Sequence, residues 1–264
     1  MNKSIRKTLA CILFLTALLA ISTFAQNRAK VGPERRATEK IIREYLLSHP
    51  EVVREAMQVL QVKEDKERLQ LTTANIKKFT NEIYSDVGSP VLGDAEGDVQ
   101  IVVFYDYFCG YCRKTLPALT ELIAKDPSLK IIYKEFPIMG ERSTTAAKAV
   151  LAASLQGRFR EFHDAMIQTE VVDDEMLKLL AEKFSVDVVR FQNDMNSEQI
   201  AAAISRNIKL AENLNISGTP AYLIGMQFVP GAVSQETLAS LISEERAKLA
   251  ANRAAKTVRT NSLD

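Results

Sequence analysis

Two short apolar runs separated by one helical segment constrain the fold more than any other feature of this chain. Residues 100–105 include the run Ile-Val-Val-Phe-Tyr, and a second apolar stretch covers residues 129–133. Continuous apolar strands of this kind are typical of sheets that are buried on both faces. The segment 109–125 between them has helical character, with Pro117 as an expected kink. Strand, helix and strand in this order predict a βαβ unit with a right-handed crossover.

The chain after this unit predicts a set of helices and then a hairpin. Residues 141–214 carry four or five helical segments with no strand among them. The turn residues at 217–220 end that pattern, and two short strands follow at 221–224 and 228–229. A helix at 234–249 closes the domain. The sequence therefore predicts an α/β fold of the βαβ–ββα type with an all-helical insertion at about 141–214.

Residues 26–86 predict an N-terminal helical extension, with apolar faces at 41–47 and 52–62 and Pro50 at a first helical turn. Turn residues at 87–98 place the domain boundary near 87, so the second domain covers 87–250 and a flexible polar tail covers 251–264. Helices of this length cannot bury such faces alone. They either fold back on the second domain or pack against a second copy, and we expect an oligomerisation region that forms a homodimer.

The first 25 residues have the layout of a cleaved export signal. A basic start is followed by an uncharged apolar run at 9–24, and Thr23-Phe24-Ala25 offers a cleavage site after Ala25. The alternative is an uncleaved membrane anchor, for which the run is short. Cleavage removes Cys11 and leaves Cys109 and Cys112 as the two cysteines of the mature chain.

The charge balance argues against nucleic acid as a partner. Cleavage removes three of the 34 basic residues and none of the 33 acidic ones, which leaves a small net negative charge. Such a balance gives no electrostatic attraction to nucleic acid or to an anionic membrane surface.

The motif Phe108-Cys109-Gly110-Tyr111-Cys112 lies between the first apolar strand and the helix that follows it. A thiolate, and not a thiol, attacks a disulfide, and the free N–H groups at a helix N-terminus stabilise an anion there. Two intervening residues bring the second sulfur within reach of the first. Cys109 is therefore expected to attack, and Cys112 to resolve the mixed disulfide, without any cofactor.

Two other interpretations of the cysteine pair are a stabilising disulfide and half of a metal site. A disulfide across such a short loop restricts the unfolded chain little. A tetrahedral zinc site needs further ligands, and the chain offers only His49 and His163, which have no ligand spacing. We expect a redox pair and no metal.

These residues resemble a known family. The strand–CxxC–helix arrangement, the late Thr219-Pro220 and the helical insertion are similar to DsbA-like proteins of the thioredoxin superfamily. Asp106, the Gly110-Tyr111 pair and Ser-Gly-Thr-Pro-Ala at 217–221 resemble the disulfide isomerase DsbC. The segment Ile-Ile-Arg-Glu-Tyr-Leu-Leu-Ser-His-Pro-Glu-Val at 41–52 resembles the N-terminal region of ScsC-like proteins.

The resemblance implies roles for particular residues. Thr219 and Pro220 would form a cis-proline loop that faces the cysteines and binds an extended substrate, whereas an ordinary trans turn is the alternative. Gly110 and Tyr111 would tune the site. Glu135 could relay protons to Cys112, although we interpret it as a solvated acid at a strand end. Many relatives place a buried acid six residues before the first cysteine, where this chain has Val103.

The resemblance also implies a function. We expect a periplasmic thiol–disulfide oxidoreductase that acts on cysteine-containing exported proteins, with isomerase or reductase character and a DsbD-like or DsbB-like membrane redox partner. One alternative is a monomeric DsbA-like oxidase. Another is a copper- or zinc-binding thiol protein, since some ScsC-like relatives are linked to copper tolerance.

Overall fold

The computed structural model describes residues 32–261, so the expected signal at 1–25 lies outside the described residues. The chain divides into two compact units, one extending to Lys66 and the other from Glu67 onward. Within residues 32–261, no helix is both long and apolar enough to cross a membrane.

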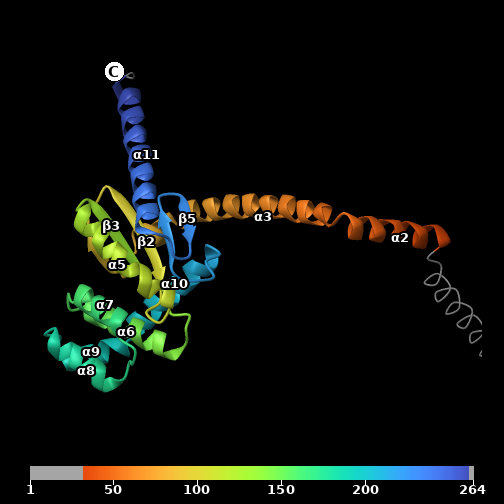
Figure 1. Cartoon of the computed structure of the whole chain (residues 1–264). Coiled ribbons are helices and arrows are strands. Elements are labelled where there is room, and N and C mark those ends of the chain that lie inside the picture. The colour runs from red at the N-terminus through yellow and green to blue at the C-terminus, as the bar shows by residue number, and fades with distance from the viewer. Residues whose placement is uncertain (1–31, 262–264) are drawn as a thin grey trace, which may run out of the picture. The chain divides into compact units, whose positions relative to one another are not determined.

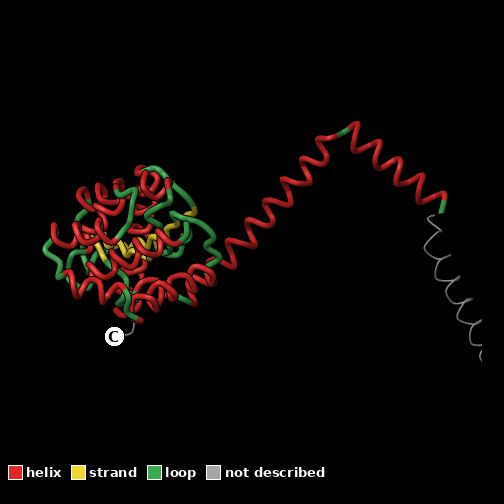
Figure 2. The backbone as a smooth tube through the Cα atoms, turned by 90° about the horizontal axis from the view of Figure 1, so that it is seen from below, coloured by secondary structure: helices red, strands yellow, loops and turns green. Residues whose placement is uncertain are grey.

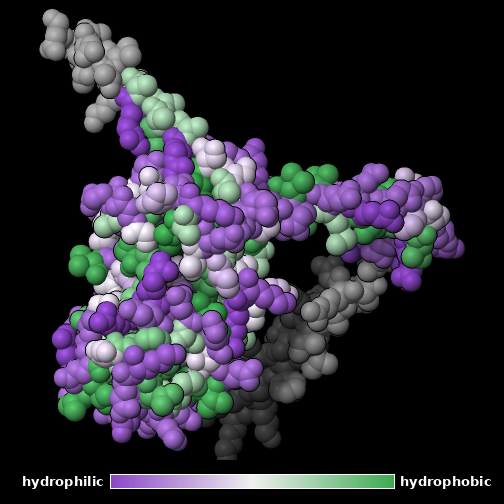
Figure 3. All heavy atoms as spheres, turned by 60° about the vertical axis from the view of Figure 1, so that its left-hand side comes forward, coloured by the Kyte–Doolittle hydropathy of each residue, from purple (hydrophilic) through white to green (hydrophobic). Residues whose placement is uncertain are grey.

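The N-terminal unit consists of helix α2 (Pro33–Ser48) and the first part of helix α3 (Pro50–Lys78). Helix α3 begins at Pro50, as the sequence predicts, and His49 separates the helices with its ring stacked 4.4 Å from that of Tyr45. Helix α2 has no buried residue. Apolar side chains interrupt the polar surface of these helices (Figure 3), and the large exposed ones are Ile41, Ile42, Tyr45, Leu47, Val53, Met57, Val59, Leu60 and Val62.

A mixed five-stranded sheet forms the centre of the C-terminal unit, with helices on both of its faces (Figures 1 and 2). The strand order is β1-β3-β2-β4-β5. Strands β2 and β3 are parallel, and β1, β4 and β5 each pair antiparallel with a neighbour. Their bounds are β1 (Val91–Gly93), β2 (Val99–Tyr105), β3 (Leu129–Glu135), β4 (Ala221–Ile224) and β5 (Gln227–Pro230).

The structure confirms the thioredoxin-like βαβ–ββα order. Helix α5 (Gly110–Lys125) connects the parallel strands β2 and β3, and β4 and β5 form the expected hairpin. Strand β1 was not expected, because the turn residues around it mask a three-residue strand. Gly93 ends this strand with φ +88°, and a Cβ there would lie 2.1 Å from the carbonyl oxygen of Leu129.

The expected helical insertion lies between β3 and β4. It contains five helices, and three of them begin at side-chain caps on Asp173, Asp187 and Ser197. The bounds are α6 (Glu141–Ser154), α7 (Phe159–Gln168), α8 (Asp174–Lys183), α9 (Val188–Met195) and α10 (Glu198–Asn213).

The two faces of β2 bury different cores. Val103 and Tyr105 face a large cluster with α5, the insertion and the closing helix α11 (Gln235–Asn261). Val102 and Phe104 face a smaller cluster, in which Ile76 of α3 and Ile83 of α4 (Thr80–Tyr84) are fully buried.

Two boundaries differ from the sequence-based expectation. The unit that carries the sheet begins at Glu67 rather than near residue 87, because the apolar side chains of α3 and α4 complete its smaller core. The ammonium group of Lys134, fully buried in β3, donates to the carbonyl oxygen of Glu82 at 2.8 Å and to Asp86 at 3.0 Å. Helix α11 continues to Asn261 instead of ending at 249, since alanine, lysine and arginine favour helix throughout this segment.

Candidate active site

The structure places Cys109 at the N-cap of helix α5 and Cys112 in its first turn. Both are free thiols, with exposed fractions of 7% and 0%. Strand β2 fixes the position of Cys109, because the apolar residues of β2 are buried in the centre of the sheet and the strand ends four residues before this cysteine. The two thiols lie close enough to form a hydrogen bond with one another.

The surroundings of Cys109 stabilise a thiolate. Burial by itself would raise the pKa of this thiol, but hydrogen bonds with Thr219, with the backbone N–H groups of Cys112 and Tyr111 and with the Cys112 thiol lower the pKa below its usual value. The backbone N–H groups of Tyr111 and Cys112 are the free donors expected at a helix N-terminus. These contacts favour a thiolate, the reactive form of a cysteine, at Cys109.

The surroundings of Cys112 have the opposite effect. Burial raises the pKa of this thiol to about 12, and the charge of Cys109 adds to that increase. At neutral pH Cys112 is therefore a protonated thiol, whose attack requires a mixed disulfide at Cys109 and loss of its own proton. The pKa values of the two thiols shift in opposite directions because the helix N–H groups reach Cys109, whereas Cys112 is fully buried.

The turn at Thr219-Pro220 contacts the nucleophile. Its peptide bond is cis, as the family resemblance implied. The Cys109 thiol donates to the carbonyl oxygen of Thr219 at 3.2 Å. The hydroxyl of Thr219 is buried and has no hydrogen-bond partner among the described residues, so it is available to donate to a thiolate at Cys109.

The residues between and after the cysteines differ in exposure. Tyr111 is 65% exposed, and a Cβ on Gly110 would meet no atom within 4 Å, so both present an open surface beside the thiols. Arg113 is not a free helix charge, because its guanidinium donates to the carbonyl oxygens of Tyr107 (2.7 Å) and Thr169. Lys114 lies 6.0 Å from the ring of Tyr111.

Our interpretation of Glu135 as a solvated acid was wrong. The side chain is 1% exposed and accepts hydrogen bonds from Tyr105 and, at 3.4 Å, from Tyr107. Burial raises the pKa of this carboxyl well above its usual value, so a neutral acid is favoured. Residue 103 is a fully buried valine that pairs with Tyr133, so the buried acids at the ends of the parallel strands are Glu135 and Asp106.

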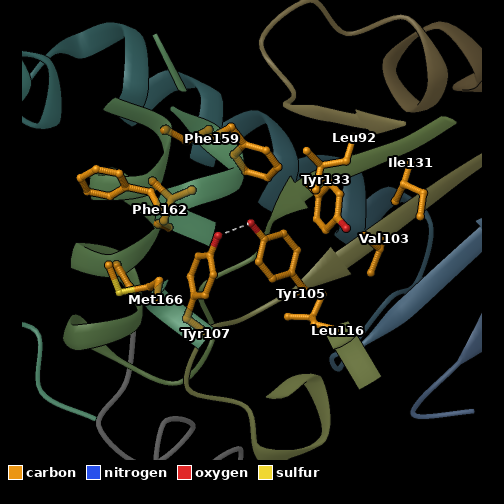
Figure 4. Packing of buried hydrophobic residues seen from close by; sticks show 14 of the residues in the cluster. Leu92, Val103, Tyr105, Tyr107, Leu116, Ile131, Tyr133, Phe159, Phe162 and Met166 are labelled. Carbon is orange, nitrogen blue, oxygen red and sulfur yellow. Dashed lines mark hydrogen bonds between the residues drawn. The ribbon is translucent and has the colours of Figure 1, made fainter. Parts of the chain in front are cut away.

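A buried polar cluster surrounds Glu135. The hydroxyls of Tyr105 and Tyr107 point toward one another at 2.7 Å (Figure 4), and His163 Nδ1 lies 2.8 Å from the Tyr107 hydroxyl. Burial, with a smaller contribution from Arg160, lowers the pKa of His163 to about 3. Because His163 is therefore neutral at pH 7, this cluster carries hydrogen bonds rather than charge, and His163 packs in the insertion as expected.

Asp106 is a site residue whose role the sequence did not disclose. Its fully buried carboxyl group accepts hydrogen bonds from the N–H groups of Phe108 and Ile138. Its backbone carbonyl accepts from Cys109 N at 3.1 Å. The available signal was an acidic residue directly after an apolar strand and three residues before the first cysteine.

Other candidate sites lie elsewhere or are absent. A cavity of about 630 Å³, lined by Phe79, Asp86, Lys134 and Arg206 among others, opens beside the smaller core and not beside the cysteines. Within residues 32–261, no group of three or more histidine, cysteine or carboxylate side chains could hold a metal ion.

Comparison with known proteins identifies the family. Residues 100–243, more than half of the chain, match the DSBA-like thioredoxin domain. The chain belongs to this family. Residues 34–67 of the DsbA-like chain also match the N-terminal domain of the copper resistance protein ScsC.

Solved structures extend the likeness. A thioredoxin-like oxidoreductase from Silicibacter pomeroyi is 34% identical, with 63% of this chain and 97% of that one covered and a TM-score of 0.60. A linker-deletion mutant of Proteus mirabilis ScsC is 25% identical, with 83% and 99% covered and a TM-score of 0.62. The Na(+)/H(+) antiporter NhaA 3 of Salinispora tropica is 28% identical over 58% of this chain, but the match spans only 24% of the antiporter.

Proposed function

We propose that this protein is a thiol–disulfide oxidoreductase that acts on the cysteines of exported proteins in the periplasm. The observation that carries the proposal is the opposed pKa shift of the two cysteines, which gives Cys109 a lowered pKa and Cys112 one of about 12. The Thr219 contact supports it further, because that turn leads directly into strand β4 and offers backbone groups beside the sulfur.

Trapping of mixed disulfides tests this proposal. The Cys112→Ser variant should accumulate mixed disulfides with protein substrates through Cys109, because no second thiol resolves them. The Cys109→Ser variant is the matched control and should neither trap substrate nor turn over. Trapping through Cys112 in that control, with none through Cys109, would reverse the two roles.

We further propose isomerase or reductase character, with a homodimer formed through the N-terminal unit and a DsbD-like membrane partner. The match of residues 34–67 to the ScsC N-terminal domain and the exposed apolar residues of α2 and α3 support self-association. Paired sites would let one thiolate search the disulfides of a client held by the other. A monomer would instead suit a DsbB-like partner and an oxidase.

Light scattering on the full mature chain tests the dimer. Leu47→Glu and Met57→Glu replace side chains that are 69% and 66% exposed, and each should shift the dimer toward monomer. Gln58→Glu adds the same charge to the same helix without removing an apolar side chain, and it should leave the dimer intact. A monomeric unmutated chain would exclude the dimer and favour the oxidase alternative.

Copper or zinc binding by the two thiols is a second candidate, favoured by the copper resistance family that residues 34–67 match. Stoichiometric metal on the reduced protein, without turnover of a disulfide substrate, would support it. Equilibration with glutathione buffers separates the redox options, since a potential near −120 mV is typical of DsbA and one near −180 mV of protein disulfide isomerase.

A further inference from the structure

The carboxyl group of Asp106 joins the two loops that follow the parallel strands. Its Oδ1 accepts hydrogen bonds from the N–H of Phe108 at 2.7 Å and the hydroxyl of Ser143 at 2.8 Å. Its Oδ2 accepts from the N–H groups of Ile138 at 2.8 Å and Met139 at 2.9 Å. One side chain, only 1% exposed, therefore fixes the turn before Cys109 and the loop after β3.

The backbone of Asp106 contacts both cysteines. Its carbonyl oxygen accepts from Cys109 N at 3.1 Å, and its backbone forms a hydrogen bond with the Cys112 thiol that lowers the pKa of that group against the larger effect of burial. Any shift of Asp106 would therefore move the active-site turn as well as the adjacent loop.

The loop that Asp106 holds exposes two apolar side chains. Ile138 is 41% and Met139 50% exposed, although each has its N–H buried against the carboxyl group. A second contact supports the same arrangement, because the guanidinium of Arg142 lies 4.4 Å from the ring centre of Phe108. Through Asp106 and the Arg142–Phe108 contact, the loop is joined to the active-site turn that precedes Cys109.

We propose that Asp106 is a positioning residue that fixes the loop at 138–139 relative to the active-site turn, so that a protein substrate bound across the loop and the turn presents its disulfide to Cys109. The inference rests on the proposed oxidoreductase function and adds a requirement that is specific to protein substrates. Cys109 can attack a small electrophile that does not touch the loop, so that reaction does not depend on the position of the loop.

Asp106→Asn tests the proposal with little change in shape. An amide offers one acceptor oxygen, so its NH2 group must face either the N–H of Phe108 or those of Ile138 and Met139. Ser143→Ala is the matched control, because it removes one donor and leaves the carboxyl group with its three backbone bonds. All rates are measured well below the melting temperature of each variant.

We expect Asp106→Asn to lower kcat/KM for a disulfide-bonded protein substrate by about tenfold, the effect of about 1.4 kcal/mol from one lost buried hydrogen bond. The rate at which iodoacetamide alkylates Cys109 should change less than about threefold. At least one of the backbone amides of Phe108, Ile138 and Met139 should exchange hydrogen about tenfold faster. Ser143→Ala should stay near the unmutated protein in all three measurements.

Three results would overturn the proposal. They are unchanged kinetics in Asp106→Asn, an alkylation rate that falls as far as the protein reaction, or an equal loss in Ser143→Ala. Should Asp106→Asn fail to fold, hydrogen exchange in the unmutated protein tests the proposal. Rapid exchange of the Ile138 and Met139 amides would show that Asp106 does not hold this loop. Neither the alkylation nor the exchange measurement depends on oxidoreductase activity, so failure of the proposed function would be recognised separately.

Discussion

Replacing Glu135 by glutamine tests whether this protein buries a neutral acid at the end of β3. Glutamine keeps the shape of the side chain and retains an oxygen that can accept from Tyr105 and Tyr107. It does not titrate, whereas burial raises the pKa of Glu135 well above its usual value. The two proteins should therefore differ in how their stability depends on pH.

The sign follows from proton binding. An acid whose pKa is raised on folding contributes fully to the free energy of unfolding below its unfolded pKa, about 4.3. This contribution is lost as the pH rises toward the folded pKa. Over that interval the free energy of unfolding of the unmutated protein should fall relative to Glu135→Gln by about 1.4 kcal/mol per pH unit. From pH 5 to pH 6 this is a loss well above the error of a urea titration.

Urea unfolding of both proteins at several pH values between 4 and 8 measures the difference. Glu121→Gln is the control, because Glu121 is exposed and its ion pair with Lys125 lowers its pKa, so no such slope is expected. Parallel curves for Glu135→Gln and the unmutated protein would show that Glu135 is ionised in the folded state. A slope of the opposite sign would refute the burial argument altogether.

Two further predictions concern the thiols and the unexpected strand. At pH 7.5, Cys112 in Cys109→Ser should be alkylated more than about tenfold more slowly than an ordinary thiol, because burial, the largest cause of its raised pKa, remains when the charge of Cys109 is removed. A rate within tenfold of that thiol would contradict its burial. Gly93→Ala should cost more than about 2 kcal/mol in urea unfolding, whereas Gly140→Ala, at φ +98° in open space, should cost about 1 kcal/mol, and equal costs would refute the contact with Leu129.

The strand and helix pattern around the cysteines could be predicted because local signals agree there. Each element has its own local signal: the apolar runs at 101–105 and 129–133 predict the two strands, and the cysteine spacing marks the start of the helix between them. Strand β1 escaped prediction because three residues between turns carry too little pattern. Its pairing with Ile131 and Ile132 is a tertiary contact that no local signal discloses.

The site shows the same division. The position of Cys109 and Cys112 at the start of a helix could be predicted from sequence because it depends on local spacing. The burial of Glu135 could not be predicted, because an acid at a strand end is usually solvated. Only the folded structure shows that Tyr105, Tyr107 and His163 enclose it. His163 arrives from an insertion helix 28 residues further along the chain, so only the folded packing reveals that contact.

The helical insertion between β3 and β4 does not disturb the site, and the sheet register explains why. Strand β4 runs antiparallel to β2 and pairs Ala221 with Phe104, so the residues just before Ala221 must lie next to those just after Phe104. Thr219 therefore reaches Cys109 across 110 positions of sequence, with its carbonyl oxygen 3.2 Å from the sulfur. Lengthening a connection adds only slowly to the entropic cost of closing it. The insertion can consequently grow or be remodelled while the pairing of β2 with β4 holds Cys109 and the Thr219-Pro220 turn together.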